Sequence, residues 1–179
     1  MAGFPNMMQP NYDPEAVQPM RDELLAVGFE EALTPEALDA ILDVQDDQVV
    51  LVFMNSVCGC AAGSARPGIC EALQHSVIPD RNVTVFAGQD KAAVAHLREK
   101  YLADQPPSSP AIAMFKNGEL LVMVHRYMIE GRMPEELSAA LRQVFDQLCT
   151  RQGPSVPKEQ YDQVVHARQC GSKIPRFQG

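Results

Sequence analysis

Two cysteines separated by one glycine, Cys58-Gly59-Cys60, have the clearest capacity for chemistry in this 179-residue chain. They follow an apolar run at residues 48–54 and precede a segment with a helical pattern. A thiol at a helix N-terminus faces unpaired N–H groups and the positive end of the helix dipole, which stabilise its thiolate. Because the thiolate is the attacking species in thiol–disulfide exchange, this placement indicates redox chemistry.

The spacing of the pair favours a mechanism with two thiols. Gly59 permits a tight turn between the cysteines because it has no Cβ. We expect Cys58 to attack a disulfide and Cys60 to resolve the mixed disulfide that forms, although spacing alone leaves the order of attack open. A disulfide that closes so small a ring would be strained and therefore easily reduced.

Other interpretations of the cysteines stay open. Paired thiolates bind soft metals such as Cu(I) and zinc, but two ligands do not complete a tetrahedral zinc site. A metal would need Cys70, Cys149, Cys170 or a second chain, and two core cysteines without a role are a further alternative. We expect Cys70 to be buried and Cys149 to be inert. Cys170, beside Gly171, could resolve a mixed disulfide, link two chains or have no role.

The first half of the chain alternates between helical and strand-like patterns. Thr34 and Pro35 are typical of a helix cap and first turn. The expected elements are a helix at 19–27, a helix from 35, a strand at 48–54, a helix from near Cys60, a strand at 83–86 and a helix from Asp90 to about 102. This alternation favours parallel strands joined by right-handed crossovers.

The second half changes to an antiparallel pattern. Residues 111–116 and 119–124 are expected strands, and Asn117-Gly118 between them is a strong hairpin signal. A last helix is expected at about 134–149. Parallel βαβ units followed by a hairpin and a closing helix are the thioredoxin-like order. The predicted fold is therefore α/β, with a central mixed sheet and flanking helices.

A proline-rich loop, residues 106–110, precedes the first hairpin strand. In the thioredoxin-like fold, a proline at this place commonly has a cis peptide bond and lies beside the reactive sulfur. Most X–Pro bonds are trans, but the fold favours a cis Ser109–Pro110 bond here. We therefore expect Ser109 and Pro110, together with Gly59, to position the substrate.

The chain divides into three parts. Residues 1–15, with three prolines, are expected to form a flexible arm, and residues 16–149 to form the thioredoxin-like domain. Residues 150–179 are a C-terminal extension. Within the extension, residues 158–170 are expected to form one more helix, ended by Gly171.

Composition excludes several classes of partner. Lys plus Arg number 15 against 23 Asp plus Glu, a net charge of −8, which argues against binding to nucleic acid or to anionic membranes. The longest apolar run, residues 49–54, is too short to span a bilayer, and the first residues lack a signal-peptide pattern. We therefore expect a cytoplasmic protein with reduced cysteines. The sequence leaves the oligomeric state open.

Four segments together resemble the bacilliredoxin family: residues 54–63 followed by Ala65-Arg66-Pro67, and residues 83–91, 106–110 and 128–131. The resemblance covers about residues 13–149. It implies a thioredoxin-like thiol–disulfide oxidoreductase that removes bacillithiol from S-bacillithiolated protein cysteines. It also implies Cys58 as the attacking thiol, Cys60 as the second thiol, bacillithiol as co-substrate, and no metal or tightly bound cofactor.

Some features depart from the family pattern or remain ambiguous. The family has a histidine near the position of Tyr127, whereas His125 lies two residues earlier here, and the extension with Cys170 lies beyond the family's usual end. Arg66 could hold a thiolate or a ligand carboxylate, or be an ordinary surface arginine. His166 has no spacing that suggests a site. A disulfide isomerase would use the same chemistry on other substrates.

Overall fold

The computed structural model describes residues 8–179, and within them five strands form a mixed sheet in the order β1-β4-β2-β5-β6. Strands β1, β4 and β2 are parallel, while β5 runs antiparallel to β2 and β6 antiparallel to β5. The strands are β1 (Glu30–Glu31), β2 (Val49–Asn55), β4 (Arg81–Phe86), β5 (Ala111–Lys116) and β6 (Glu119–Val124). This order and these directions are those of the thioredoxin-like fold and confirm the predicted class.

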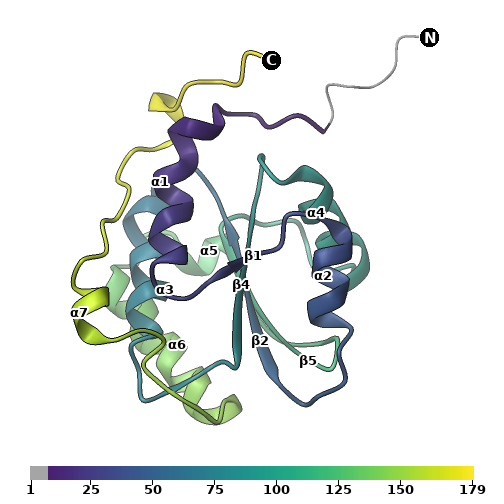
Figure 1. Ribbon diagram of the computed structural model, residues 1–179, viewed down its shortest axis with the longest axis vertical. Helices are drawn as coiled ribbons and strands as arrows, with labels where there is room; N and C mark the ends of the chain where they lie inside the picture. Colours follow the sequence, from purple (N-terminus) through teal and green to yellow (C-terminus); the bar gives the residue numbers. More distant parts are fainter. Residues whose placement is uncertain (1–7) are drawn as a thin grey trace.

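Helices cover both faces of the sheet, which is seen nearly edge-on in Figure 1. One face carries α1 (Pro14–Leu25), α3 (Arg66–Ala72) and α6 (Pro134–Leu148), and the other carries α2 (Pro35–Leu42) and α4 (Lys91–His96). Every residue of β2 is buried because helices pack on both of its faces, which explains the continuous apolar run. A large apolar cluster therefore lies on each side of β2.

Capping and turn residues in the sequence correctly predicted the positions of several helices and strands. Thr34 caps α2, and its hydroxyl accepts a hydrogen bond from the N–H of Ala37 at 3.1 Å. Asn117 and Gly118 both have positive φ, 53° and 79°, as a tight two-residue hairpin turn requires. The hairpin strands β5 and β6 and the closing helix α6 lie where the sequence predicted them.

The predicted start of the first helix, at Pro19, is wrong. Helix α1 begins at Pro14, because the Asp13 side chain caps it by accepting a hydrogen bond from the N–H of Glu15. Residues 1–7 of the predicted arm lie outside the described residues. From residue 11 the chain is tied to the domain, since the N–H of Asn11 donates to the carbonyl of Gly88 at 2.8 Å.

The predicted cap of α4 is correct in position but not in its bonding. Asp90 occupies the N-cap, yet its side chain makes no capping hydrogen bond to the helix. Its carboxylate instead pairs with Arg21 at 2.7 Å and accepts the N–H of Phe86 at 3.0 Å. The helix continues through a π-helical segment, Leu97–Tyr101, so the predicted end near Leu102 is confirmed.

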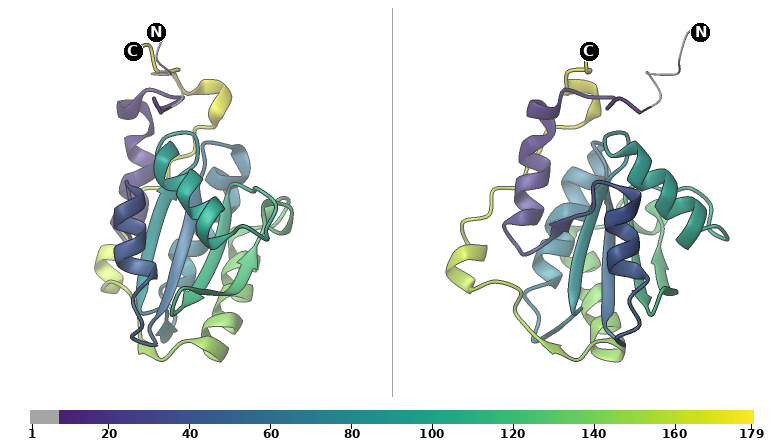
Figure 2. Two further views of the ribbon diagram at one scale, coloured as in Figure 1. Left: turned by 90° about the vertical axis from the view of Figure 1, so that its right-hand side faces the viewer. Right: turned by 45° about the vertical axis from the view of Figure 1, so that its right-hand side comes forward.

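The predicted helix at residues 158–170 is wrong. Only α7 (Lys158–Tyr161) is helical there, and a 3-10 turn follows at Gly171–Lys173. Figure 2 shows that the segment between them runs in the opposite direction to α1 and leads back toward the N-terminus of α1. A short ribbon of β3 (Val77–Ile78) and β7 (Arg151–Gln152) joins the start of the extension to the domain.

The far end of the extension lies beside the chain that precedes α1. The N–H of Asp13 donates to the carbonyl of Pro175 at 2.9 Å, and the N–H of Phe177 donates to the carbonyl of Asn11 at 3.2 Å. Ile174 is buried against the N-terminal half of α1. Residues 171–177 are therefore packed on the domain.

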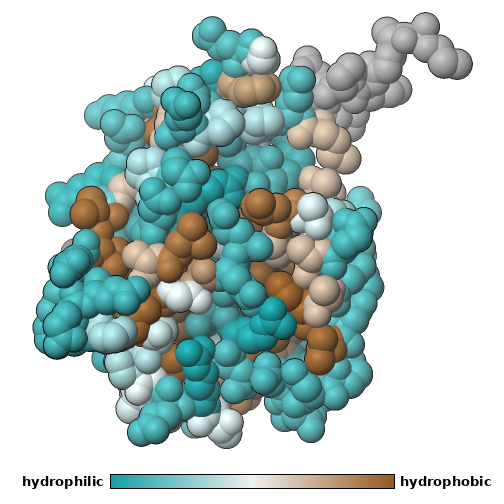
Figure 3. All heavy atoms as spheres, viewed as in Figure 1, coloured by the Kyte–Doolittle hydropathy of each residue, from teal (hydrophilic) through white to brown (hydrophobic). Residues whose placement is uncertain are grey.

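The visible surface is mainly polar. On the face in Figure 3, hydrophilic residues cover most of the surface and the hydrophobic ones form separate patches. This is expected where each helix turns its apolar stripe toward the sheet. Among the described residues, no helix has the length and apolar character needed to cross a membrane.

Gly153, in the extension directly after β7, should tolerate no side chain. A Cβ at this position would lie 2.0 Å from the carbonyl oxygen of His75. We predict that Gly153→Ala lowers the free energy of unfolding by about 1–3 kcal/mol through overpacking, measured by urea denaturation.

Gly63→Ala is the matched control for Gly153→Ala, because nothing lies within 4 Å of its added Cβ. Gly63 is in a helical segment, so this change should be neutral or stabilising by about 0.4–1 kcal/mol. Equal effects of the two substitutions would contradict the close packing at Gly153.

Candidate active site

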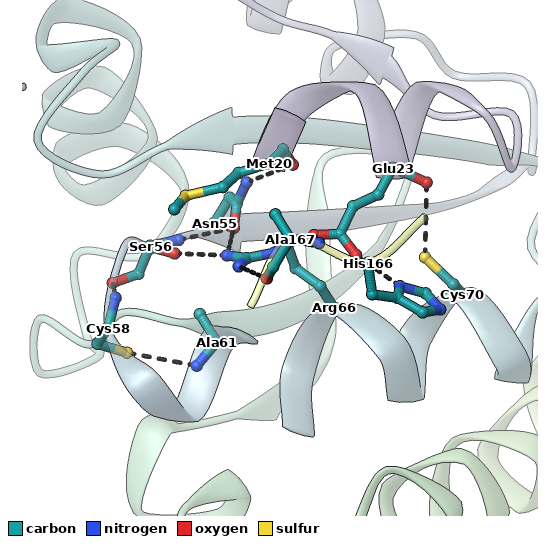
Figure 4. A network of polar contacts seen from close by, with 10 residues as sticks. All are labelled: Met20, Glu23, Asn55, Ser56, Cys58, Ala61, Arg66, Cys70, His166 and Ala167. Atoms are coloured by element: carbon teal, nitrogen blue, oxygen red, sulfur yellow. Dashed lines mark hydrogen bonds and ion pairs between the residues drawn. The ribbon is translucent and has the colours of Figure 1, made fainter. Parts of the chain in front are cut away.

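The cysteine pair lies at the carboxyl end of β2, where the chain turns into a helix (Figure 4 shows Cys58). The carbonyl of Cys58 accepts the N–H of Ala62 at 3.2 Å, so Cys58 stands at the beginning of the helical segment. That segment starts with a π-helical turn, Ala61–Ala65, and continues as α3. The strand-to-helix placement predicted from the sequence is confirmed.

The two sulfur atoms face one another. Cys58 Sγ and Cys60 Sγ are 2.7 Å apart, and both cysteines are half-buried free thiols. The N–H of Ala61 also points at Cys58 Sγ, at 3.4 Å. Cys58 Sγ can thus accept hydrogen bonds from the helix backbone and from its partner thiol, which favours its negatively charged form.

These contacts separate the pKa values of the two thiols. Burial raises the pKa of Cys58, but hydrogen bonds from Cys60, Ser56 and the Ala61 N–H, with the charge of Arg126, outweigh burial and lower it overall. For Cys60, burial, donation to Cys58 and repulsion by the Cys58 thiolate raise the pKa to about 11. Cys58 is therefore the thiol of the pair that loses its proton more readily.

Arg126 is a neighbour that the sequence analysis missed. It begins α5 (Arg126–Ile129), and its guanidinium charge favours the thiolate of either cysteine. Its Nε pairs with Glu130 at 2.6 Å, and its backbone N–H donates to the Ser108 hydroxyl at 2.7 Å. No spacing signal connects Arg126 with the cysteines, because the pairing of β2 with β5 and of β5 with β6 brings them to one end of the sheet.

The Ser109–Pro110 bond is cis, as predicted. Pro110 is buried and immediately precedes β5, whose first residue, Ala111, pairs with Met54 near the end of β2. The cis bond therefore lies at the same end of the sheet as the cysteine loop. The carbonyl of Ser109 accepts a long hydrogen bond, 3.5 Å, from the guanidinium of Arg126.

Arg66 is not a surface residue, and it contacts neither thiol. Its side chain is fully buried and pairs through Nε with the buried carboxylate of Glu23 in α1 (Figure 4). Its Nη1 donates to the carbonyl of Ser56 at 2.8 Å and to Asn55 Oδ1 at 3.1 Å. Arg66 thus holds the loop that leads from β2 to Cys58.

The C-terminal extension joins the same network. Arg66 Nη2 donates to the carbonyl of Ala167 at 3.0 Å, and His166 Nδ1 lies 2.6 Å from Glu23 Oε2. A little further along, a Cβ at Gly171 would lie 3.2 Å from Val57 Cγ2, so the extension also packs against the residue before Cys58. Sequence spacing gave no signal for His166, since its partner is far away in the chain.

The remaining cysteines differ in burial. Cys70 is fully buried, as predicted, and burial raises its pKa well above the ordinary value. Burial likewise raises the pKa of Cys149 to about 12, so neither thiol is poised to react. Cys170 is half-buried. Within residues 8–179, no three His, Cys, Asp or Glu side chains are grouped so as to hold a metal ion.

We predict that Arg66→Met lowers the free energy of unfolding by about 3–5 kcal/mol, because it removes the cation that is fully buried with the Glu23 carboxylate and leaves only the hydrogen bonds from the extension. Urea denaturation measures the change. Arg81→Met, which breaks the partly exposed pair with Glu30, is the control and should cost no more than about 1 kcal/mol. Similar losses of unfolding free energy in both variants would show that the buried pair stabilises the protein no more than the partly exposed pair does.

We predict that Cys58 reacts first with iodoacetamide and that Arg126→Gln moves the pH midpoint of this reaction upward, by up to about one unit. Loss of the cation destabilises the Cys58 thiolate and so raises its pKa. Peptide mass spectrometry after timed alkylation measures the midpoint. Lys158→Gln removes a cation from a similar i,i+4 pair, with Asp162, and should leave the midpoint in place. A downward shift in Arg126→Gln would contradict the assignment.

Comparison with known proteins adds to these findings. Residues 12–149 match a family model described as Disulphide isomerase. A bacilliredoxin of Salinibacter ruber is 44% identical over 143 residues, which cover 80% of this chain and 83% of that protein. A bacilliredoxin of Cytophaga hutchinsonii is 47% identical over 137 residues, covering 76% and 99%.

Among solved structures, oxidised thioredoxin O2 of Arabidopsis thaliana matches with 15% identity and a TM-score of 0.48, covering 66% of this chain and 96% of that one. The family model and the sequence relatives span most of the chain, including the Cys58–Cys60 pair. The chain therefore belongs to the bacilliredoxin family, and its role is thiol–disulfide exchange.

Proposed function

We propose that this protein removes bacillithiol from S-bacillithiolated protein cysteines, with Cys58 as the attacking thiol and Cys60 as the resolving thiol. The supporting observation is that Cys58 Sγ can accept hydrogen bonds from both the Ala61 N–H and the Cys60 thiol while it remains only half-buried. That environment stabilises a reachable thiolate. The choice of bacillithiol is supported by the relatives, which are named bacilliredoxins.

In the first step, the Cys58 thiolate attacks the bacillithiol sulfur of the target's mixed disulfide. The sulfur–sulfur bond to the target breaks, and the target cysteine leaves as a thiolate that takes a proton from water. A new disulfide then joins Cys58 to bacillithiol. No net oxidation occurs, because one disulfide replaces another.

In the second step, Cys60 loses its proton and attacks Cys58 Sγ, and bacillithiol leaves as a thiolate. Repulsion by the Cys58 thiolate is one reason for the high pKa of Cys60. This repulsion vanishes once Cys58 is bound in a disulfide, so attack by Cys60 becomes easier at the stage where it is needed. Free bacillithiol is the alternative second nucleophile and would leave as bacillithiol disulfide. Reduction of the resulting Cys58–Cys60 disulfide to two thiols would take two electrons, supplied by the oxidation of two further thiols to a disulfide.

We further propose that Gly59, Ser109 and Pro110 position the mixed disulfide. Gly59 is exposed, and nothing lies within 4 Å of the place its Cβ would occupy, which keeps the approach to Cys58 open. Ser109 and Pro110 lie at the same end of the sheet. Bacillithiol is the only co-substrate in this scheme, without a metal or tightly bound cofactor, and a cytoplasmic location would keep the thiols reduced.

A bacillithiol-modified protein provides the direct test. The native chain should release bacillithiol, whereas Cys58→Ser should abolish release because the attacking thiolate is missing. Cys60→Ser should accumulate a Cys58–bacillithiol adduct, which intact-protein mass spectrometry detects. Parallel incubation with a glutathione-modified protein measures the preference for bacillithiol.

Cys170→Ser is the matched control, since it removes another half-buried thiol and should leave release unchanged. Unchanged release in Cys58→Ser would sink the proposed mechanism. An adduct that persists in Cys170→Ser but not in Cys60→Ser would assign the resolving role to Cys170 and contradict the role of Cys60.

Disulfide isomerisation is the second candidate, because the matching family model is described as Disulphide isomerase. It would use the same Cys58 thiolate on disulfides between two protein cysteines. Reactivation of an enzyme with scrambled disulfides, without release of bacillithiol in the first assay, would favour this candidate over the first.

A further inference from the structure

A pocket of about 530 Å³ lies at the same end of the sheet as the cysteine pair. Its walls are the loop at residues 106–109 and the side chains of Arg98, His125, Arg126, Tyr127 and Glu130. Ser109 in its wall lies just before β5, whose residue Ala111 pairs with Met54 near the end of β2, so the pocket and the cysteine loop share one end of the sheet. The charges of Arg126 and Glu130 in its wall also act on Cys60. Its volume is within the range that holds small molecules, about 300–1,000 Å³.

Arg98 brings a positive charge to this pocket that no carboxylate balances. It forms no ion pair with any residue of the described part of the chain, and its Nε is buried without a hydrogen-bond partner there. Among residues 8–179, the one hydrogen-bond acceptor of its Nη2 is the thioether sulfur of Met54, a weak acceptor, at 3.4 Å. Burial lowers the pKa of Arg98, and no nearby anion offsets this. Such a guanidinium is suited to an anion from outside the chain.

The other charges in the pocket nearly cancel. Arg126 pairs with Glu130 at 2.6 Å, so Arg98 supplies the net positive charge. The chain as a whole carries −8, so the pocket is electrostatically unlike the rest of the protein. The net negative charge of the protein would repel an anionic ligand, whereas Arg98 would attract it to the pocket.

The aromatic side of the pocket is also open to a ligand. The Tyr127 side chain is 74% exposed and its ring stacks on that of His125, with centroids 5.7 Å apart. His125 is itself buried, with Nε2 3.0 Å from Gln105 Oε1, while its Nδ1 has no partner among the described residues. Buried polar atoms rarely stay unpaired, so an outside donor or acceptor is expected there.

We propose that this pocket is a subsite for the carboxylate-bearing part of a small thiol, and that Arg98 pairs with the carboxylate. The proposal rests on the exchange proposed for Cys58 and specifies which small thiols are favoured. The sulfur of the small thiol reacts with Cys58, its carboxylate forms an ion pair with Arg98, and the rest of the molecule packs against Tyr127. Arg98 is a binding residue in this scheme and takes no part in the exchange of sulfur–sulfur bonds.

Two probes that differ only in their carboxylates test the subsite: the 2-pyridyl disulfides of glutathione and of glutathione diethyl ester. In the full-length Cys60→Ser background, Cys58 attacks the glutathione sulfur and 2-thiopyridone leaves, which absorbance follows. The Cys58→Ser/Cys60→Ser protein supplies the rate of the other thiols for subtraction. The ratio of acid to ester rates reports carboxylate recognition and is independent of the intrinsic reactivity of each variant.

We expect the acid to react about tenfold faster than the ester, the effect of one charge-assisted hydrogen bond. Arg98→Met should reduce the ratio to about one or below, since the net charge of −8 then disfavours the acid. Arg98→Lys, which keeps the positive charge, should retain part of the preference for the acid over the ester. Arg81→Met removes an arginine near the opposite end of the sheet and should retain the full ratio.

Two outcomes would overturn the subsite: a ratio near one in the Cys60→Ser background, or an unchanged ratio in Arg98→Met. These outcomes are separate from the failure of the proposed function. If bacillithiol is not removed from modified proteins but the ratio depends on Arg98, the subsite stands and serves another anionic thiol. If bacillithiol is removed but the ratio is near one, the proposed function stands without the subsite.

Discussion

The buried ion pair between Arg66 and Glu23 is the constraint on which the reactive loop depends. Two charges without access to solvent are stable only if every donor and acceptor around them is satisfied. Arg66 meets this condition by binding the end of β2, the carbonyl of Ser56 and the carbonyl of Ala167. One side chain thereby links α1, α3, the loop before Cys58 and the C-terminal extension (Figure 4).

The chemistry of the thiol pair follows from a second balance, between burial and hydrogen bonding. Burial disfavours a thiolate on either cysteine. Only Cys58 is compensated, because the helix backbone and the neighbouring thiol can both donate to it. Cys58, at the start of the helix, is therefore the thiol that ionises more readily, and the high pKa of Cys60 favours its protonated form.

Charge also distinguishes the pocket lined by Arg98, Arg126 and Tyr127 from the rest of the surface. The protein is acidic overall, yet Arg98 stands in that pocket without a carboxylate partner in the described residues. An unbalanced guanidinium is unfavourable unless something pairs with it. A small anionic thiol would satisfy Arg98 and bring its sulfur to Cys58 at once, so recognition and exchange would be combined in one region.

Signals that act over a few residues were sufficient for the alternation of helices and strands, the capped helix at Thr34, the hairpin at Asn117 and the position of Cys58 at a strand-to-helix junction. Each depends on local backbone preference or on the periodicity of apolar residues. The burial of Arg66, the approach of Arg126 to the thiols and the extended path of residues 162–170 were decided only by the tertiary structure. Their partners lie tens to more than a hundred residues away in the chain, and contacts at such separations leave no periodic trace in the sequence.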